Sequence, residues 1–298
     1  MVTLVDKIKK SGIPFAEQAP MSGLSTFKIG GTADVLAEPE TIEQVVVLAS
    51  AILETKIDYV IIGGGSNILI SDEGFRGVVI HPKLKKLEQQ DNKIRAGSSI
   101  SLQRFVQFCT NKGLSGVEHL VGIPGSVGGA LVGNAGTARE WINSSIETVI
   151  VVNMTNATKE QFTGDECHYA YRNSIFKDSQ ERLIVEGVFR LTRKATDEIQ
   201  KTMKEYLSRR SKQPSGSSSA GCVFKNPKEV PAGQLIDQLG LKGKRIGKAQ
   251  IATDHGNFIL NLGGAKATDI IKLISYVKQQ ARDKRGIQLQ EEIRYIGF

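Results

Sequence analysis

Two glycine-rich runs in this sequence could bind phosphate. The first is "GGGSN" at residues 63–67, and the second, "GIPGSVGGALVGNAG" at 122–136, holds six glycines in fifteen positions. Backbone N–H groups that no side chain shields bind phosphate well, and such loops at strand or helix ends supply them. Neither run is followed by Gly-Lys-Ser/Thr, and neither has the dinucleotide fingerprint spacing. Two loops in one domain indicate a dinucleotide, and the alternative is a pair of tight turns with close backbone packing.

The cysteines and histidines indicate neither a disulfide framework nor a metal site. Cys109, Cys167 and Cys222 have no paired or CxxC spacing, which fits a reducing compartment. His255 stands alone in "DHGNF", so a structural role is preferred to that of a general base. No cluster of His, Cys, Asp or Glu predicts a bound metal.

The elements around the glycine runs follow an α/β pattern. Residues 33–67 read as strand, helix, strand and glycine loop, and Thr41 with Gln44 makes a capping-box pattern at the helix start. A second unit begins with "NKIRAGSSI" and continues into a helix. Its apolar residues fall on one face, which predicts that they are core and that its cysteine is inert: Leu102, Phe105, Val106 and Cys109.

A further unit follows a helix predicted at about 197–211. The stretch "KQPSGSSSAGCVFKNP" after this helix has the composition of a linker, but compact elements follow at once, including a long helix from about 268 to 282 and a closing strand "EEIRYIG". We therefore expect an α+β protein with a domain boundary near residue 195.

Composition bounds the class of protein. A chain of 298 residues is longer than a single hydrophobic core usually supports, so more than one domain is expected. Its 40% hydrophobic and 23% charged residues are typical of a folded protein. The net charge of +8 either attracts an anionic small molecule or belongs to a solvated basic face, and composition leaves both open. The sequence shows no signal peptide and no membrane span, so we expect a cytoplasmic protein without membrane insertion.

Six blocks of the sequence resemble those of one enzyme family. They are "IIGGGSNILISDEGFRGVVI", "GIPGSVGGALVGNAG", "YRNSIFK", "AGCVFKNP", "HGNFILNLGGAKATDI" and "EEIRYIG". In this order they resemble UDP-N-acetylenolpyruvoylglucosamine reductases, the flavoenzymes of peptidoglycan precursor synthesis. The resemblance runs from about Thr26 to the C-terminus. No insertion is seen between Arg172 and Glu186, so the chain resembles the shorter type that lacks an extra tyrosine-bearing loop.

The resemblance implies a fold and its boundaries. An FAD-binding domain of the vanillyl-alcohol-oxidase (PCMH) type, built from two α/β subdomains, precedes a C-terminal α/β substrate-binding domain. The expected segments are an N-terminal segment at 1–25, FAD subdomains at 26–82 and 83–195, and a substrate domain at 196–298. FAD would be held by the two glycine runs through Gly63, Gly64, Gly65, Ser66, Asn67, Gly125, Ser126, Gly128 and Gly129.

The resemblance also implies a reaction. NADPH reduces FAD, and the hydride then passes to the vinyl carbon of UDP-N-acetylglucosamine enolpyruvate, giving UDP-N-acetylmuramate. Arg172 matches the arginine that holds the substrate carboxylate, and Glu292 matches the glutamate that acts with it on the enolate. Cys222 stands where the family commonly has serine as the proton donor, and a thiol could donate that proton. Residues matched to substrate contacts are Lys212, Asn226 and Arg294.

Two other functions compete with this interpretation. One is an oxidase of small alcohols or sugars on the same flavin fold, against which the C-terminal blocks argue. The other is a nucleic-acid-binding protein that uses the basic charge, which leaves both glycine loops unexplained. We expect a monomer that uses small-molecule substrates and binds no nucleic acid.

Overall fold

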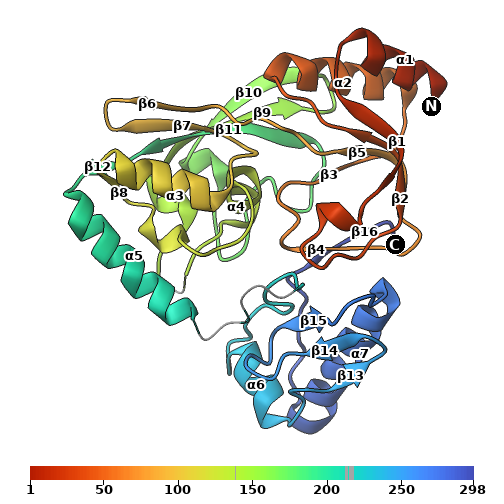
Figure 1. Ribbon diagram of the computed structural model, residues 1–298, viewed down its shortest axis with the longest axis vertical. Helices are drawn as coiled ribbons and strands as arrows, with labels where there is room; N and C mark the ends of the chain where they lie inside the picture. The colour runs from red at the N-terminus through yellow and green to blue at the C-terminus, as the bar shows by residue number, and fades with distance from the viewer. Residues whose placement is uncertain (138, 212–213, 215–217) are drawn as a thin grey trace. The chain divides into compact units, whose positions relative to one another are not determined.

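The computed structural model describes residues 1–137, 139–211, 214 and 218–298 (Figure 1). The chain forms two compact units, and each unit is built from three separate stretches of sequence. The first unit comprises Met1–Glu17, Asp34–Gly64 and Gly77–Arg209, and the second comprises Gln18–Ala33, Gly65–Arg76 and Arg210–Phe298. This division follows contacts rather than sequence order and is coarser than the four predicted segments, whose boundaries stay predictions.

The first unit contains most of the helices and strands. Its helices are α1 (Val2–Lys10), α2 (Ile42–Thr55), α3 (Leu102–Asn111), α4 (Val127–Gly133) and α5 (Thr196–Arg210), with the short 3-10 helices η2 (Glu118–Leu120), η3 (Ile142–Ser145) and η4 (Asp165–Cys167). Its strands are β3 (Tyr59–Ile61), β6 (Leu87–Gln90), β7 (Lys93–Gly97), β8 (Leu114–Ser115), β9 (Ile146–Asn153), β10 (Thr158–Thr163), β11 (Arg182–Arg190) and β12 (Thr192–Arg193). Helices and strands mix along the chain, which confirms the predicted α+β class.

A five-stranded antiparallel sheet forms the centre of this unit. Its strand order is β10-β9-β11-β7-β6. Helices α3 and α4 pack on one face of the sheet, where a large apolar cluster is buried (Figure 1). Helices α1 and α2 pack on the other face over residues such as Ile150 and Val152. Burial on both faces explains why β9 reads as a continuous apolar run.

Helix α3 behaves as its periodicity predicts. Leu102, Phe105, Val106 and Cys109 are at most 1% exposed and belong to one apolar cluster. Burial also raises the pKa of the Cys109 thiol far above its usual value, so this thiol stays protonated and unreactive. The predicted start of α2 is confirmed as well, because the hydroxyl of Thr41 accepts a hydrogen bond from the Gln44 N–H at 3.2 Å.

Strands β1 (Phe15–Pro20), β2 (Thr32–Ala37) and β5 (Phe75–Ile80) form a four-stranded sheet with β3, in the order β1-β2-β5-β3. Strands β3 and β5 run parallel. The carboxyl end of β3 leads directly into Gly63 and Gly64, so this sheet positions the first glycine loop.

The second unit has its own core. Its elements are η1 (Ser22–Leu24), β4 (Ile68–Ile70), α6 (Ala232–Gln238), β13 (Arg245–Ile246), β14 (Ala249–Ile251), β15 (Ile259–Asn261), α7 (Ala267–Arg285) and β16 (Arg294–Ile296). The core joins α6, α7 and the β13-β14-β15 sheet to Phe27, Ile29 and Leu69 from the early stretches. The closing strand β16 pairs in parallel with β4. Among the described residues no helix is long and apolar enough to cross a membrane.

Candidate functional site

The two predicted phosphate loops touch each other within the first unit. A Cβ atom built on Gly64 would lie 2.7 Å from the Cα atom of Gly125 and 2.8 Å from the backbone nitrogen of Ser126. Carbon atoms do not approach so closely without repulsion. The glycine at position 64 is therefore required by the contact between the loops, whatever else binds there.

The second loop is fixed to the start of α3. Its backbone pairs with that segment through hydrogen bonds from Leu102 N–H to the Gly125 carbonyl at 3.0 Å and from Val127 N–H to the Ile100 carbonyl at 2.8 Å. The Ser126 hydroxyl then caps α4 by accepting a hydrogen bond from Gly129 N–H at 3.3 Å. The loop backbone is thus held before any ligand arrives.

Four backbone N–H groups on these loops suit the pyrophosphate of FAD. Those of Gly63, Gly64, Gly125 and Ser126 donate to no acceptor in the part of the chain that the structure describes. Gly63 and Gly64 are exposed and Ser126 is buried, so these N–H groups lie where phosphate oxygens could reach and pair them. The residues present therefore fit the phosphate portion of FAD.

Two other glycines of the predicted set have a different role. The N–H of Gly128 donates to the Ser98 carbonyl at 2.8 Å, and the N–H of Gly129 is bound by the Ser126 hydroxyl. A Cβ on Gly128 would lie 2.7 Å from the Cβ of Ser98. Gly128 is therefore needed for packing, and contacts of Gly128 and Gly129 with the cofactor stay predictions.

The rest of the first glycine run belongs to the second unit. Gly65 has a φ of +67°, and a Cβ there would lie 1.9 Å from the Leu24 carbonyl oxygen. The Asn67 side chain donates to the Glu292 carbonyl at 3.0 Å, and the Asn67 carbonyl accepts from the Arg294 N–H at 3.0 Å. The cofactor contacts of Gly65, Ser66 and Asn67 stay predictions, and Asn67 bonds the backbone of two other predicted site residues, Glu292 and Arg294.

Arg172 lies in the first unit with an unusual backbone. Its φ is +54°, the left-handed region, which costs a residue with a side chain about 1–2 kcal/mol. Lys177 stabilises this turn by donating its Nζ to the Arg172 carbonyl at 2.6 Å. The guanidinium lies 5.9 Å from the centre of the half-exposed Tyr171 ring. Strain of this kind in a loop residue is typical of functional sites.

The loop that carries Arg172 is attached to α4. The Asn134 side chain, just after α4, donates to the Ala170 carbonyl at 3.0 Å, and the Ser174 hydroxyl donates to the Val132 carbonyl at 2.7 Å. Helix α4 therefore has the second glycine loop at its N-terminus and the Arg172 loop at its C-terminus.

Cys222 and Glu292 lie on neighbouring extended segments of the second unit. Glu292 N–H donates to the carbonyl of Val223, the residue after Cys222, at 2.7 Å. The Glu291 carboxylate accepts from Lys278 Nζ on α7 at 2.8 Å, and adjacent residues of an extended strand face opposite ways. Glu292, and not Glu291, therefore projects away from α7. Cys222 is half-buried, whereas Cys109 and Cys167 are buried.

The substrate residues differ in what the structure says of them. Lys212 lies outside the described residues. Asn226 is exposed, and its side-chain oxygen accepts a hydrogen bond from Ala232 N–H at 3.0 Å at the start of α6, which orients the side chain and leaves its amide nitrogen for a ligand. Arg294 begins β16. Their substrate contacts stay predictions.

His255 has the structural role that the sequence favoured. Its Nδ1 accepts a hydrogen bond from Asn257 N–H at 3.2 Å, and its ring packs edge-on against Phe258. Burial lowers its pKa, which keeps the ring neutral. The buried Asn257 in turn bonds both backbone groups of Phe224, so His255 supports the segment that follows Cys222.

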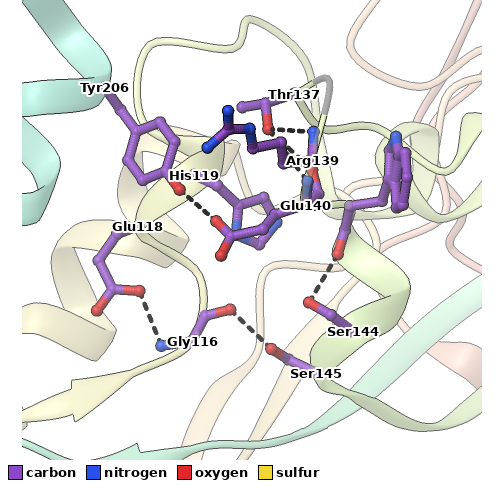
Figure 2. Close-up of polar contacts among 10 residues, drawn as sticks. Gly116, Glu118, His119, Thr137, Arg139, Glu140, Ser144, Ser145 and Tyr206 are labelled. Carbon is purple, nitrogen blue, oxygen red and sulfur yellow. Dashed lines mark hydrogen bonds and ion pairs between the residues drawn. The ribbon is translucent and has the colours of Figure 1, made fainter.

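A polar cluster beside α5 has no counterpart in the sequence predictions. Figure 2 shows the Glu140 carboxylate between the Tyr206 hydroxyl, which donates to it, and the ring of His119. His119 is 3% exposed, with Nδ1 4.0 Å from Glu140. Burial and the Glu140 carboxylate raise the pKa of Tyr206 to about 12. These residues come from three distant segments, so no local pattern in the sequence marks them. Within the described ranges no group of His, Cys, Asp and Glu could hold a metal.

Comparisons with known proteins identify relatives of this chain. A family model described as "UDP-N-acetylenolpyruvoylglucosamine reductase, C-terminal domain" matches residues 213–296, and one described as "FAD binding domain" matches residues 33–161. The chain is 38% identical over 283 residues to UDP-N-acetylenolpyruvoylglucosamine reductase 1 of Bacillus cereus, which covers 93% of each chain. It is 37% identical to UDP-N-acetylenolpyruvoylglucosamine reductase of Carboxydothermus hydrogenoformans, with 97% of this chain and 96% of the relative covered.

A solved structure shows the same fold. The crystal structure of UDP-N-acetylenolpyruvylglucosamine reductase (MurB) from Thermus caldophilus superimposes with a TM-score of 0.82 at 33% identity, covering 95% of this chain and 98% of that one. These matches confirm the predicted fold class, an FAD-binding domain of the PCMH type followed by a C-terminal substrate domain.

Proposed function

The chain belongs to the UDP-N-acetylenolpyruvoylglucosamine reductase family, and from this premise we propose that it reduces UDP-N-acetylglucosamine enolpyruvate to UDP-N-acetylmuramate with NADPH as the electron donor. It is a flavin-dependent enzyme of peptidoglycan precursor synthesis. Bound FAD supplies the carrier that takes a hydride from one substrate and gives it to the other.

The contact between the glycine loops carries the proposal. Two touching loops present four N–H groups that have no acceptor among the described residues, which suits a pyrophosphate: those of Gly63, Gly64, Gly125 and Ser126. A side chain at Gly64 could not be accommodated at the point of contact. A nucleic-acid-binding function would give these loops no purpose.

Arg172 holds the substrate carboxylate in the proposed reaction. Its planar guanidinium can bind both carboxylate oxygens at once. Hydride addition to the vinyl carbon places negative charge on the adjacent carbon and on this carboxylate, so a fixed cation lowers the barrier. The left-handed backbone at Arg172 and its bond from Lys177 support this role, because they fix the arginine in advance.

Cys222 and Glu292 also act on the enolate in the proposed reaction. The Cys222 thiol donates the proton that quenches the negative charge, which forms the new C–H bond and leaves a thiolate to be reprotonated from solvent. Glu292 stabilises the developing charge together with Arg172. The backbone bond between Glu292 and Val223 supports a joint role, since it holds the two segments at a fixed spacing.

Absorption spectroscopy tests the proposal. The purified protein should show flavin bands, which should bleach anaerobically with NADPH and return when UDP-N-acetylglucosamine enolpyruvate is added. Omission of the sugar nucleotide is the control. Absence of flavin bands after added FAD would remove the flavin function, and rapid return of the bands with oxygen alone would favour an oxidase of small alcohols or sugars.

A further inference from the structure

Asn134 occupies the junction between α4 and the Arg172 loop. It ends α4 in the left-handed conformation, with a φ of +44°, and is 3% exposed. Asparagine and glycine both end helices in this way, so the backbone alone does not require the asparagine side chain. A buried amide at such a position needs hydrogen-bond partners.

Both ends of the Asn134 amide are bonded. The nitrogen donates to the Ala170 carbonyl at 3.0 Å, and the oxygen accepts from Asn143 N–H at 3.4 Å. Ala170 pairs with Asn173 in an isolated β-bridge, so the bond from Asn134 reaches the turn that contains Arg172. The side chain thus ties the helix to the arginine turn on one side and to η3 on the other.

The segment on the η3 side is itself anchored. The Ser145 hydroxyl donates to the Gly116 carbonyl at 2.7 Å, and Glu140 accepts from Tyr206 on α5 (Figure 2). Ile142 N–H donates to the Ala135 carbonyl at 2.8 Å. Asn134 therefore joins the arginine turn to a part of the structure that is already fixed.

We propose that Asn134 is a positioning residue that sets Arg172 at a fixed distance from the FAD phosphate loop. Helix α4 has seven residues, which at 1.5 Å per residue separates its ends by about 10 Å. The glycine loop begins this helix, and the Asn134 bond attaches the arginine turn to its end. The inference rests on the proposed function, because it requires that Arg172 binds the substrate carboxylate.

The role predicts an effect on one half of the reaction. NADPH oxidation does not require that Arg172 bind the substrate carboxylate, whereas reduction of the sugar nucleotide does. Misplacement of a substrate-positioning group by about 1 Å can slow a reaction by about 100-fold. Loss of the Asn134 side chain should therefore slow the second half-reaction and leave FAD binding and the first half-reaction intact.

The test uses Asn134→Gly, which keeps a residue suited to the left-handed backbone and removes both side-chain bonds. For each variant we would measure the FAD content, the thermal midpoint and the rates of both half-reactions. Spectral titration of the oxidised enzyme gives the Kd for the sugar nucleotide. We expect a weaker Kd and at least about tenfold slower sugar-nucleotide reduction, with FAD content and the NADPH rate within twofold of the unmodified protein. Ser145→Ala is the matched control, since it removes a hydrogen bond of the anchored segment that does not reach the arginine turn.

A double-mutant cycle with Arg172→Lys separates this inference from the proposed function. If Asn134 acts through Arg172, the effect of Asn134→Gly should largely disappear in the Arg172→Lys background. Additive effects would overturn the positioning role, as would equal losses in both half-reactions or an Asn134→Gly enzyme with normal sugar-nucleotide reduction. An Arg172→Lys enzyme with normal Kd and rates would instead overturn the proposed role of Arg172.

Discussion

Replacement of Gly64 by alanine tests whether contact between the glycine loops is needed for FAD binding. The new Cβ would lie 2.7 Å from Gly125 Cα, whereas carbon atoms rest about 3.5–4.0 Å apart, so the loops must separate by about 1 Å. Overpacking of this kind costs about 1–3 kcal/mol. If FAD binding requires the loops in contact, this cost weakens the affinity by about 5- to 140-fold, at 1.4 kcal/mol for each factor of ten.

The assay is titration of the apoprotein with FAD, followed by flavin fluorescence, together with a thermal midpoint for each variant. Gly133→Ala is the control, because Gly133 lies in α4 and a Cβ there meets nothing within 4 Å. The control should bind FAD as the unmodified protein does and gain slightly in helix stability. Unchanged affinity in Gly64→Ala would refute the reasoning, and so would an equal loss in Gly133→Ala.

Three further predictions concern other residues. Ser98→Ala should stabilise the apoprotein by up to about 1 kcal/mol, because the buried Ser98 hydroxyl has no partner among the described residues. Ser99→Ala should destabilise it by about 1–2 kcal/mol, because the Ser99 hydroxyl bonds two backbone groups. Urea unfolding measures both changes. Cys222→Ser should move the alkaline limb of the pH-rate profile to higher pH, since a hydroxyl loses its proton at higher pH than a thiol. Full activity with an unchanged alkaline limb in Cys222→Ala would exclude this thiol from the mechanism. The hydrogen bond from Lys93 lowers the pKa of Glu147, so the charged carboxylate stabilises the fold above the ordinary carboxyl pKa of about 4.3, and this contribution disappears as the pH falls through the lowered value. Glu147→Gln should accordingly unfold at lower urea at pH 7, and its difference from the unmodified protein should shrink as the pH falls below the ordinary carboxyl pKa; a difference that does not change with pH would contradict this assignment.

Local patterns in the sequence predicted the local parts of the structure. The spacing of Phe105, Val106 and Cys109 predicted the buried face of α3, because a helix repeats every 3.6 residues whatever surrounds it. Thr41 predicted the start of α2 because a cap involves only residues a few positions away.

Contacts between distant segments could not be predicted in this way. Glycine composition indicated loops at Gly64 and Gly125 but gave no sign that the two loops touch. The left-handed turn at Arg172 is bonded by Lys177 at the Arg172 carbonyl and by Asn134 at the Ala170 carbonyl, and arginine has no intrinsic preference for that conformation. The roles of Arg172, Cys222 and Glu292 came from resemblance alone, since an isolated arginine, thiol or carboxylate in a sequence has many uses.

The parallel pairing of β4 with β16 has a consequence for synthesis of the chain. Asn67, just before β4, bonds to a residue 225 positions later, and the Ile68–Ile70 strand has its partner only at Arg294–Ile296. At about 5–20 residues per second, a ribosome needs roughly 11–45 s to make that intervening stretch. During this time β4 presents unpaired backbone groups that could pair with another chain. The second unit therefore cannot be completed until Arg294–Ile296 have been synthesised and have left the ribosome, long after its first segments.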